Sequence, residues 1–363
     1  MKFKADKPFL ISIFILTIFG FFIFSSASLG LLTREGARYS NVAFNQAFYG
    51  LFLGLVFFFV TSNINYKFWK KYSLFLFIAS VVATLFTFSG IGFAHGGAYR
   101  WISVGGYSIQ PSEFLKIGFI IYFAAWASNV KEKIRTFKYG FLPFVAIIIL
   151  VAAVLLAQPD TDTLMVILFT GLAMYITAGG KWRYVFFLLI GAVIGIIILA
   201  LIRPYVMQRF ITFLDPAQDS LGAGYQIQQS LIAIGSGRFF GRGFGQSIQK
   251  FNFLPEPMGD SVFAVAAEEF GFLGSSFLIL LFLFFASRGM KIAIKSPDTF
   301  GRLLVVGIVI LIISQSFVNI AAMLGVLPLS GNVLLFVSHG ATALLMTLAE
   351  VGIIVNISKY QRS

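Results

Sequence analysis

The sequence lacks cysteine and is poor in histidine and in charged residues. Without cysteine it has neither a disulfide framework nor a thiolate metal site. Its two histidines, His95 and His339, have no carboxylate partner at a zinc-binding spacing, so a zinc site is not indicated. Charged residues make up 11% of the chain and hydrophobic residues 58%, and the mean hydropathy is +0.91. A soluble domain of 363 residues is far less apolar, so this chain is expected to fold in a membrane.

Acidic residues are also scarce, since 14 stand against 27 basic ones and the formal net charge is +13. Such a charge can indicate a nucleic-acid-binding protein, in which basic residues gather on one soluble surface. Here the basic residues lie between apolar runs, so nucleic acid is not an expected partner. Membrane topology explains their placement better.

Apolar runs long enough to cross a bilayer, which takes roughly 20 residues, recur along the chain. They predict an all-α polytopic membrane protein with about ten transmembrane helices in a single domain, 1–363. The first run is longer than the roughly 7–15 apolar residues of a signal peptide, so we expect it to be retained. The predicted spans are 8–32, 44–62, 73–92, 112–129, 141–157, 163–179, 182–202, 261–287, 303–326 and 334–357.

The basic residues predict which way the chain crosses the membrane. With the N-terminus inside, about 18 of the 27 basic residues fall in cytoplasmic segments, as the positive-inside rule requires. Both termini are then cytoplasmic, and the one long connection, about 203–260, is external. Apolar, aromatic and glycine residues are interleaved in it, which predicts re-entrant or interfacial helices, one of them around 225–234.

Acidic residues lie where predicted helices begin at the outer face. Glu113 and Lys116 are three residues apart, so they share one helix face and can form an ion pair. Asp160 and Asp162 precede the sixth span, and Asp260 precedes the eighth. For Asp160 and Asp260, the alternative to a functional role is that each only caps a helix N-terminus. For Glu113 and Lys116, the alternative is an ion pair that holds the helix end.

The external connection carries basic residues that can receive a phosphate or diphosphate near helix N-termini. They are Arg209, Arg238, Arg242 and Lys250. Binding of anionic lipid headgroups by the same residues is the alternative. Glu268 and Glu269, deeper in the eighth span, are expected to face the bundle, as members of a polar network or as proton carriers. A divalent cation could bind the outer carboxylates, although no ligand motif requires one.

Short motifs follow one another in a fixed order along nearly the whole chain. They are GAYRWI (97–102), SIQPSEFLK (108–116), QPD (158–160), RF and FLDP (209–216), GYQ (224–226), QSLIAIGSG (229–237), LPEP (254–257) and FVS (336–338). Together they resemble the SEDS family (shape, elongation, division and sporulation) of FtsW and RodA. Gln249 and Lys250, just before the LPEP run, are more similar to the division branch, FtsW, than to the elongation branch, RodA.

The resemblance implies a peptidoglycan glycosyltransferase that polymerises lipid II at the outer face of the bacterial cytoplasmic membrane. It implies a class B penicillin-binding protein as partner, besides other division or elongation proteins. Asp260 is then the general base that deprotonates the acceptor hydroxyl, with inversion at the donor sugar and release of undecaprenyl diphosphate. The residues expected to bind substrate are Arg100, Glu113, Lys116, Asp160, Arg209, Arg242, Lys250, Glu256 and Ser338.

Two other classes of function fit the same features. A lipid II flippase also needs polar residues inside a helical bundle, although the inner halves of most spans here are almost wholly apolar. A non-catalytic scaffold would only recruit and activate its partner, and its outer acids would be structural. The chain also departs from the family pattern, since Asp162 stands where glycine is usual, and Met258 and Gly259 replace a His-Thr pair.

Overall fold

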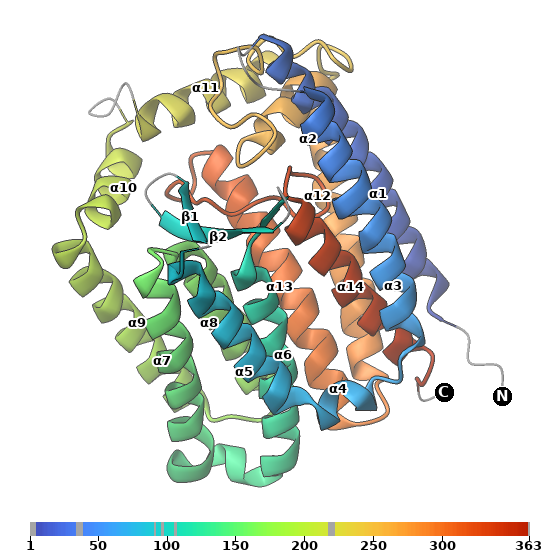
Figure 1. Ribbon diagram of the computed structural model, residues 1–363, viewed down its shortest axis with the longest axis vertical. Coiled ribbons are helices and arrows are strands. Elements are labelled where there is room, and N and C mark those ends of the chain that lie inside the picture. Colours follow the sequence, from blue (N-terminus) through green and yellow to red (C-terminus); the bar gives the residue numbers. More distant parts are fainter. Residues whose placement is uncertain are drawn as a thin grey trace.

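The fold is a bundle of long helices with a small antiparallel sheet at one end, in a computed structural model that describes residues 5–33, 39–90, 92–95, 98–104, 107–216 and 222–361 (Figure 1). The helices are α1 (Lys7–Ala27), α2 (Tyr39–Asn45), α3 (Leu53–Asn63), α4 (Lys67–Lys71), α5 (Ser73–Leu85), α6 (Pro111–Val130), α7 (Leu142–Ala157), α8 (Thr161–Thr177), α9 (Trp182–Ile202), α10 (Pro204–Leu214), α11 (Ala223–Ser236), α12 (Val262–Ile294), α13 (Thr299–Met323) and α14 (Ala341–Ser358). Tighter or wider helical turns extend or connect them at η1 (Ser28–Thr33), η2 (Gln46–Phe52), η3 (Phe86–Phe88), η4 (Lys131–Arg135) and η5 (Phe137–Phe141). The sheet has the order β1 (Gly92–His95), β2 (Ala98–Val104), β3 (Tyr107–Ile109).

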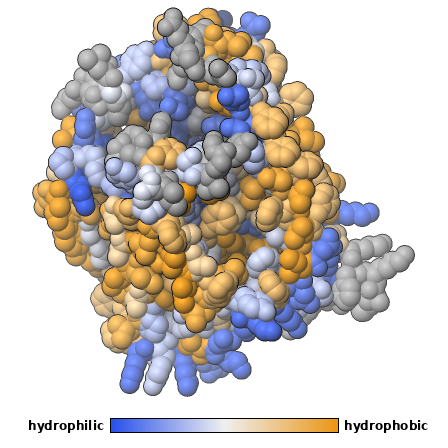
Figure 2. All heavy atoms as spheres, viewed as in Figure 1, coloured by the Kyte–Doolittle hydropathy of each residue, from blue (hydrophilic) through white to orange (hydrophobic). Residues whose placement is uncertain are grey.

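The surface carries a hydrophobic belt between two more hydrophilic ends (Figure 2). Within the described part of the chain, 7 helical segments are long and apolar enough to cross a membrane, and two shorter apolar ones, Ser73–Phe88 and Thr161–Thr177, lie beside them. The beginning of α1 and the end of α14 lie together at the end that holds α4, where Asp6 N donates to Ser358 Oγ at 3.1 Å. The chain is therefore an integral multi-pass membrane protein.

The core of the bundle is built around α13, which packs against α6, α8, α12 and α14. The most apolar windows of α13 and α14 are 72% and 83% buried, whereas that of α9 is only 6% buried. A helix that is apolar on all sides must be surrounded either by protein or by lipid. Protein surrounds α13, whereas the apolar surface of α9 is left to lipid. Helices α9, α10 and α11 form an arm along one edge of the molecule (Figure 1).

Most of the predicted helices are present, and two stretches differ. Each predicted span contains a helix, and the helix expected around 225–234 is α11, whereas the number of membrane crossings stays a prediction. The prediction of a helix over 334–340 is wrong, because this stretch is irregular. Residues 334–337 are nevertheless buried. Irregular backbone survives at such depth only where protein groups satisfy it. The sheet at 92–109 was not predicted, since β1 and β3 have only 4 and 3 residues and the sequence of β2, AYRWISV, does not alternate between apolar and polar residues.

The connection between α9 and α12 docks onto a kink in α12. Gly271 interrupts this helix with φ 65° and ψ −163°, a left-handed backbone that favours glycine. A Cβ on Gly271 would lie 2.2 Å from Gly241 N, so the two segments touch through their backbones. Backbone N–H groups of Arg242 and Gly243 donate to the carbonyls of Glu268 and Glu269 at 3.0 and 2.9 Å. The first two turns of α12 are thus fixed by the connection that precedes them.

Gly237→Ala should destabilise this docking, by roughly 1–3 kcal/mol in the free energy of unfolding. An added Cβ would lie 2.0 Å from the carbonyl oxygen of Ala267 in α12, so α11 would have to move away. The measurement is thermal unfolding of the purified protein in detergent. Gly235→Ala, in the last turn of α11, is the control, because no atom lies within 4 Å of its added Cβ. Equal melting temperatures for the two variants would contradict the close packing of α11 on α12.

Candidate active site

Asp260 lies at the end of a tight turn that leads into α12. The N–H groups of Gly259 and Ser261 both donate to the carbonyl of Glu256 at 3.1 Å. The N-cap residue of α12 is Ser261, and the carboxylate of Asp260 accepts no hydrogen bond within the described part of the chain. The alternative that Asp260 only caps the helix is therefore wrong, and its side chain is left free to react.

The irregular stretch before α14 holds this turn in place. Ser338 Oγ donates to the carbonyl of Gly259 at 2.8 Å and accepts from Leu334 N at 2.9 Å. Asn319 of α13 donates through Nδ2 to the carbonyls of both Asp260 and Asn332, each at 2.7 Å. The hydroxyl of Ser338 thus holds the backbone of the Asp260 turn in position. Substrate binding by Ser338 stays a prediction.

Charged groups from three elements converge beside Gly331, in that same stretch. A Cβ on Gly331 would lie 3.4 Å from Asp162 Oδ2, 3.9 Å from Arg100 Nη1 and 3.9 Å from Asp260 Oδ2. Asp162 accepts from Gly331 N at 3.0 Å and pairs with Arg209 Nη1 at 2.7 Å. The missing side chain at Gly331 leaves space between the free carboxylate of Asp260 and the guanidinium of Arg100, and Asp162 links this space to Arg209.

Asp160 serves mainly as a helix cap beside this cluster. Its carboxylate accepts from Thr163 N at 3.4 Å, as the N-cap of α8, and lies 3.8 Å from Arg100 Nη1. Arg100, on β2, also donates to the carbonyl of Pro159. The cap, which was the alternative to a functional role, is present and places the Asp160 carboxylate beside the guanidinium of Arg100, while substrate binding by Asp160 stays a prediction.

Burial raises the pKa of Asp260 to about 7, and the carboxylates of Glu256 and Asp162 add to this effect, while Arg209 and Arg100 oppose it. Glu256 itself is exposed at the edge of the turn. Burial also raises the pKa of Asp160, against the charge of Arg100. A carboxylate with a pKa near neutrality can take a proton from a hydroxyl and release it again at physiological pH.

The predicted ion pair of Glu113 and Lys116 is confirmed at 2.8 Å, with both side chains buried at the start of α6. Lys116 Nζ also donates to Gln315 Oε1 of α13 at 2.7 Å. Gln315 Nε2 donates to the carbonyl of Val333, so this pair connects to the stretch that holds Asp260. Glu350 of α14 is buried close by, within electrostatic reach of Lys116.

Arg242 and Lys250 belong to a second network rather than to the Asp260 cluster. Lys250 is fully buried, with Nζ 2.7 Å from Glu269 Oε1 and 2.9 Å from both Ser26 Oγ and Gly245 O. Arg242 Nε lies 3.3 Å from Glu268 Oε1. Glu268 lies about 12 Å from Asp260 along the axis of α12, at a rise of roughly 1.5 Å per residue. The ammonium donors of Lys250 are used within the protein, and substrate binding by Lys250 stays a prediction.

No cluster of metal-ligating side chains accompanies the carboxylates of the site in the described part of the chain. Across the described residues, no group of three or more histidine, aspartate or glutamate side chains is placed to hold a metal ion. Two carboxylates, of Asp162 and Asp260, approach each other beside Gly331, and that of Asp162 is already held by Arg209 and Gly331 N.

Residues that connect the site were not predicted from the sequence. They are Gln315, Asn319, Gly331, Asn332 and Glu350. A signal did exist for two of them, because Gln315 and Asn319 are amides four residues apart within an apolar span. Polar side chains at such depth usually face the bundle interior.

Comparisons with known proteins identify relatives of this chain. The model of the cell cycle protein family of FtsW, RodA and SpoVE matches residues 7–363. Stage V sporulation protein E of Bacillus subtilis (strain 168) is 38% identical over 311 residues, which cover 85% of each chain. A probable peptidoglycan glycosyltransferase FtsW of Geobacter sp. (strain M18) is 37% identical over 358 residues, covering 98% of this chain and 97% of the relative.

Solved structures share the fold. A chain of a peptidoglycan synthase complex superposes with a TM-score of 0.80 at 24% identity, over 99% of both chains. The rod shape determining protein RodA of Thermus thermophilus superposes with a TM-score of 0.72 at 21% identity, over 99% of this chain and 98% of RodA. By its sequence match over almost the full length, this chain belongs to the SEDS family of FtsW, RodA and SpoVE.

Proposed function

We propose that this protein is a peptidoglycan glycosyltransferase that polymerises lipid II into glycan strands at the outer face of the cytoplasmic membrane. Family membership and the FtsW relatives support this reaction class. The observation that carries the site assignment is the free carboxylate of Asp260 beside the guanidinium groups of Arg100 and Arg209. A sugar hydroxyl and a diphosphate need these two kinds of group, a base and a cationic clamp.

In this reaction Asp260 removes the proton from the acceptor sugar hydroxyl. The oxygen attacks the anomeric carbon of the donor sugar, and the bond from that carbon to the diphosphate oxygen breaks. Attack opposite the leaving group inverts the anomeric carbon and releases undecaprenyl diphosphate. Arg100 and Arg209 offset the negative charge that develops on the diphosphate.

The other carboxylates are poorer candidates for the base. Asp162 is engaged by Arg209 at 2.7 Å and by Gly331 N at 3.0 Å. Asp160 caps α8, and Glu113 is paired with Lys116 at 2.8 Å. An acid already held by cations or N–H groups gives up part of its basicity. The carboxylate of Asp260 accepts no hydrogen bond within the described residues, and burial raises its pKa to about 7.

The remaining predicted residues divide into two groups. Glu113 and Lys116 stabilise the start of α6 and connect it through Gln315 to the stretch that holds the Asp260 turn. Arg242 and Lys250 fix the external connection on α12 and do not touch substrate. Glu256 raises the basicity of Asp260 through its negative charge.

The whole chain acts as one domain, with both termini cytoplasmic and the connection at about 203–260 external. A class B penicillin-binding protein crosslinks the strands beside it, a partnership supported by the fold shared with a chain of a peptidoglycan synthase complex. A role in cell division, rather than elongation, is supported by the identity of 37% to an FtsW relative over nearly the full chain.

Polymerisation of labelled lipid II by the purified protein with its penicillin-binding partner tests the proposed function. Glycan strands are expected in the absence of any other polymerase. If no strands form while labelled lipid II crosses the bilayer of proteoliposomes, the chain is a flippase. If neither occurs and the partner alone is activated, it is a scaffold.

Arg209→Gln should lower kcat/KM for lipid II by roughly 10–100-fold, because one cation facing the diphosphate is lost. The polymerisation rate at several lipid II concentrations is the measurement. Arg203→Gln is the control, since Arg203 is an exposed arginine of the same connection and is not among the charges that act on Asp260. Equal losses in the two variants would mean that only the general positive charge of the surface matters.

A further inference from the structure

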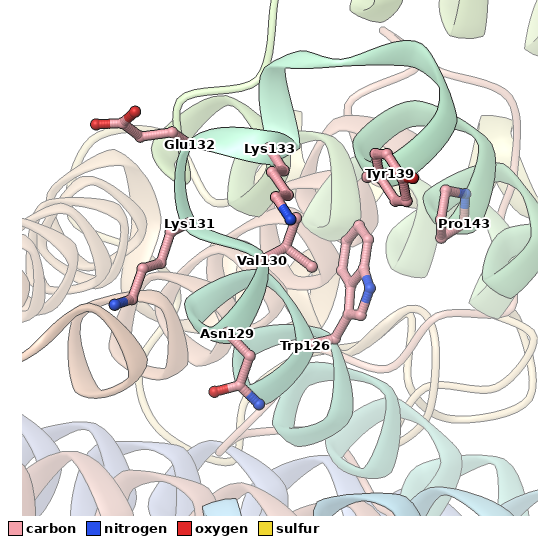
Figure 3. A pocket seen from close by; sticks show the side chains of 8 residues that line it. All are labelled: Trp126, Asn129, Val130, Lys131, Glu132, Lys133, Tyr139 and Pro143. Atoms are coloured by element: carbon pink, nitrogen blue, oxygen red, sulfur yellow. The ribbon is translucent and has the colours of Figure 1, made fainter.

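A pocket lies at the end of the bundle that holds α4, and the proposed polymerase reaction does not use it (Figure 3). It lies where α6 ends, η4 follows and α7 begins, and its volume is about 690 Å³. Its lining residues are Trp126, Asn129, Val130, Lys131, Glu132, Lys133, Tyr139 and Pro143. The start of α1, the end of α14 and α4 lie at the same end, far from the sheet and the Asp260 turn (Figure 1).

The pocket has an apolar wall and a basic rim. Trp126, Val130 and Pro143 belong to the ends of α6 and α7, two helices that continue into the hydrophobic belt. The exposed Lys131 and Lys133 line the other side. A basic rim next to an apolar wall, at the boundary between the belt and a hydrophilic end, suits a molecule with an anionic head and hydrocarbon tails.

Charge is not neutralised at this rim. Within the described part of the chain, Lys131, Lys133 and Lys138 form no ion pair with an acid. Lys133 and Lys138 instead lie over the ring of Tyr139, with Nζ 5.6 and 5.7 Å from its centre. The one acid of the lining, Glu132, points away from Lys133 in Figure 3. The ammonium groups are therefore available to an anion from outside the chain.

The backbone is shaped to present these lysines. Lys131 ends α6 with φ 50° and ψ −127°, a left-handed conformation that is costly for a residue with a Cβ. Burial of Ile134 and a hydrogen bond from Tyr175 Oη to the Ile134 carbonyl at 3.2 Å hold the following turn in place. The rim is thus a fixed part of the fold rather than a loose surface loop.

We propose that this pocket binds the headgroup of an anionic phospholipid, with the phosphate at Lys131 and Lys133 and the lipid's glycerol and upper acyl chains along Trp126 and Pro143. The wall residue Pro143 belongs to the apolar segment Phe137–Ala157, which is long enough to cross a membrane, so a lipid can reach the wall from the bilayer. Basic pockets between transmembrane helices bind such headgroups by this chemistry. The inference does not depend on the polymerase function.

Native mass spectrometry of the full-length protein in detergent, titrated with phosphatidylglycerol or phosphatidylcholine, tests the proposal. Retention of phosphatidylglycerol over phosphatidylcholine is expected, and Lys131→Gln with Lys133→Gln should weaken it roughly thirtyfold. Lys67→Gln with Lys71→Gln is the matched control, because these exposed lysines of α4 lie at the same end and carry the same charge. Equal weakening by the two double variants would overturn the proposal in favour of general surface charge.

Two further measurements separate a lipid from a free anion. Trp126→Ala leaves the charge unchanged and removes part of the apolar wall, so it should also weaken phosphatidylglycerol retention. Inorganic phosphate at millimolar concentration should leave the lipid bound, since it cannot contact the wall. Displacement of the lipid by phosphate, or full retention in Trp126→Ala, would overturn the assignment of a lipid site.

Discussion

Asp260→Asn is expected to lower the rate of lipid II polymerisation by about 10²–10⁴-fold, the range contributed by a positioned general base. The amide has nearly the same size and cannot take a proton from the acceptor hydroxyl. The Asp260 turn should keep its shape, because its hydrogen bonds involve the backbone carbonyl of Asp260 and not the carboxylate. The measurement is strand formation by the purified variant with its partner.

The control for this loss is the folded state of the variant. Asp260→Asn should melt at the temperature of the wild type and should still bind the partner protein. Asp162→Asn is a useful comparison, because it changes a neighbouring carboxylate that is held by Arg209 at 2.7 Å. Asp162→Asn should retain far more activity than Asp260→Asn, and the reverse order would identify Asp162 as the base.

Lys250→Met is expected to destabilise the protein by about 3–5 kcal/mol, the cost of leaving a buried charge without its partner. The side chains of Lys250 and Glu269 are 0% and 1% exposed, and their charged atoms lie 2.7 Å apart. Glu269 would keep hydrogen bonds from Ser26 Oγ and Ser247 N but lose its counter-charge. Thermal unfolding in detergent is the measurement.

Two variants of the same network define this effect. Arg242→Gln should cost no more than about 1 kcal/mol, because the Arg242 side chain is 38% exposed and its pair with Glu268 is screened by water. Lys250→Met combined with Glu269→Gln should recover much of the lost stability, since no charge is then left unpaired. If Lys250→Met melts like the wild type but no longer makes strands, Lys250 acts on substrate, as predicted from the sequence, and the structural role is wrong.

The helices were predictable because each apolar run has the length that a bilayer requires. The pair of Glu113 and Lys116 followed from their spacing on one helix face, and the Asp160 cap followed from its place before an apolar run. These are local features, with partners that lie three residues apart. Local spacing is what a single sequence carries most clearly.

The contacts that assemble the site are not local. Asn319 meets the turn of Asp260 across 59 positions of sequence, and Gly331 meets Asp162 across 169. Lys250 was predicted at the substrate because it lies in the external connection, and its partner Ser26 is 224 positions away in α1. Only the packing of α1 against α12 shows that this lysine is buried.

The structure shows what Asp162, which departs from the family pattern, contacts at the site. Its carboxylate joins Arg209 of α10 to Gly331 N, so it connects the outer arm of helices to the Asp260 cluster. It also raises the pKa of Asp260 through its negative charge. A glycine there would provide neither contact.

The pH dependence of lipid II polymerisation tests the role of Asp260 most directly. Because the pKa of Asp260 is raised to about 7 and the base acts in its deprotonated form, activity should fall as the pH drops through about 7 and level off above it. The measurement is kcat/KM of the purified complex between pH 5 and 9, for wild type and for Asp260→Asn. The account predicts a one-proton inflection near pH 7 in the wild type and its absence in the residual activity of the variant. A wild-type profile that stays flat across pH 5–8, or an inflection that persists in Asp260→Asn, would contradict Asp260 as the general base.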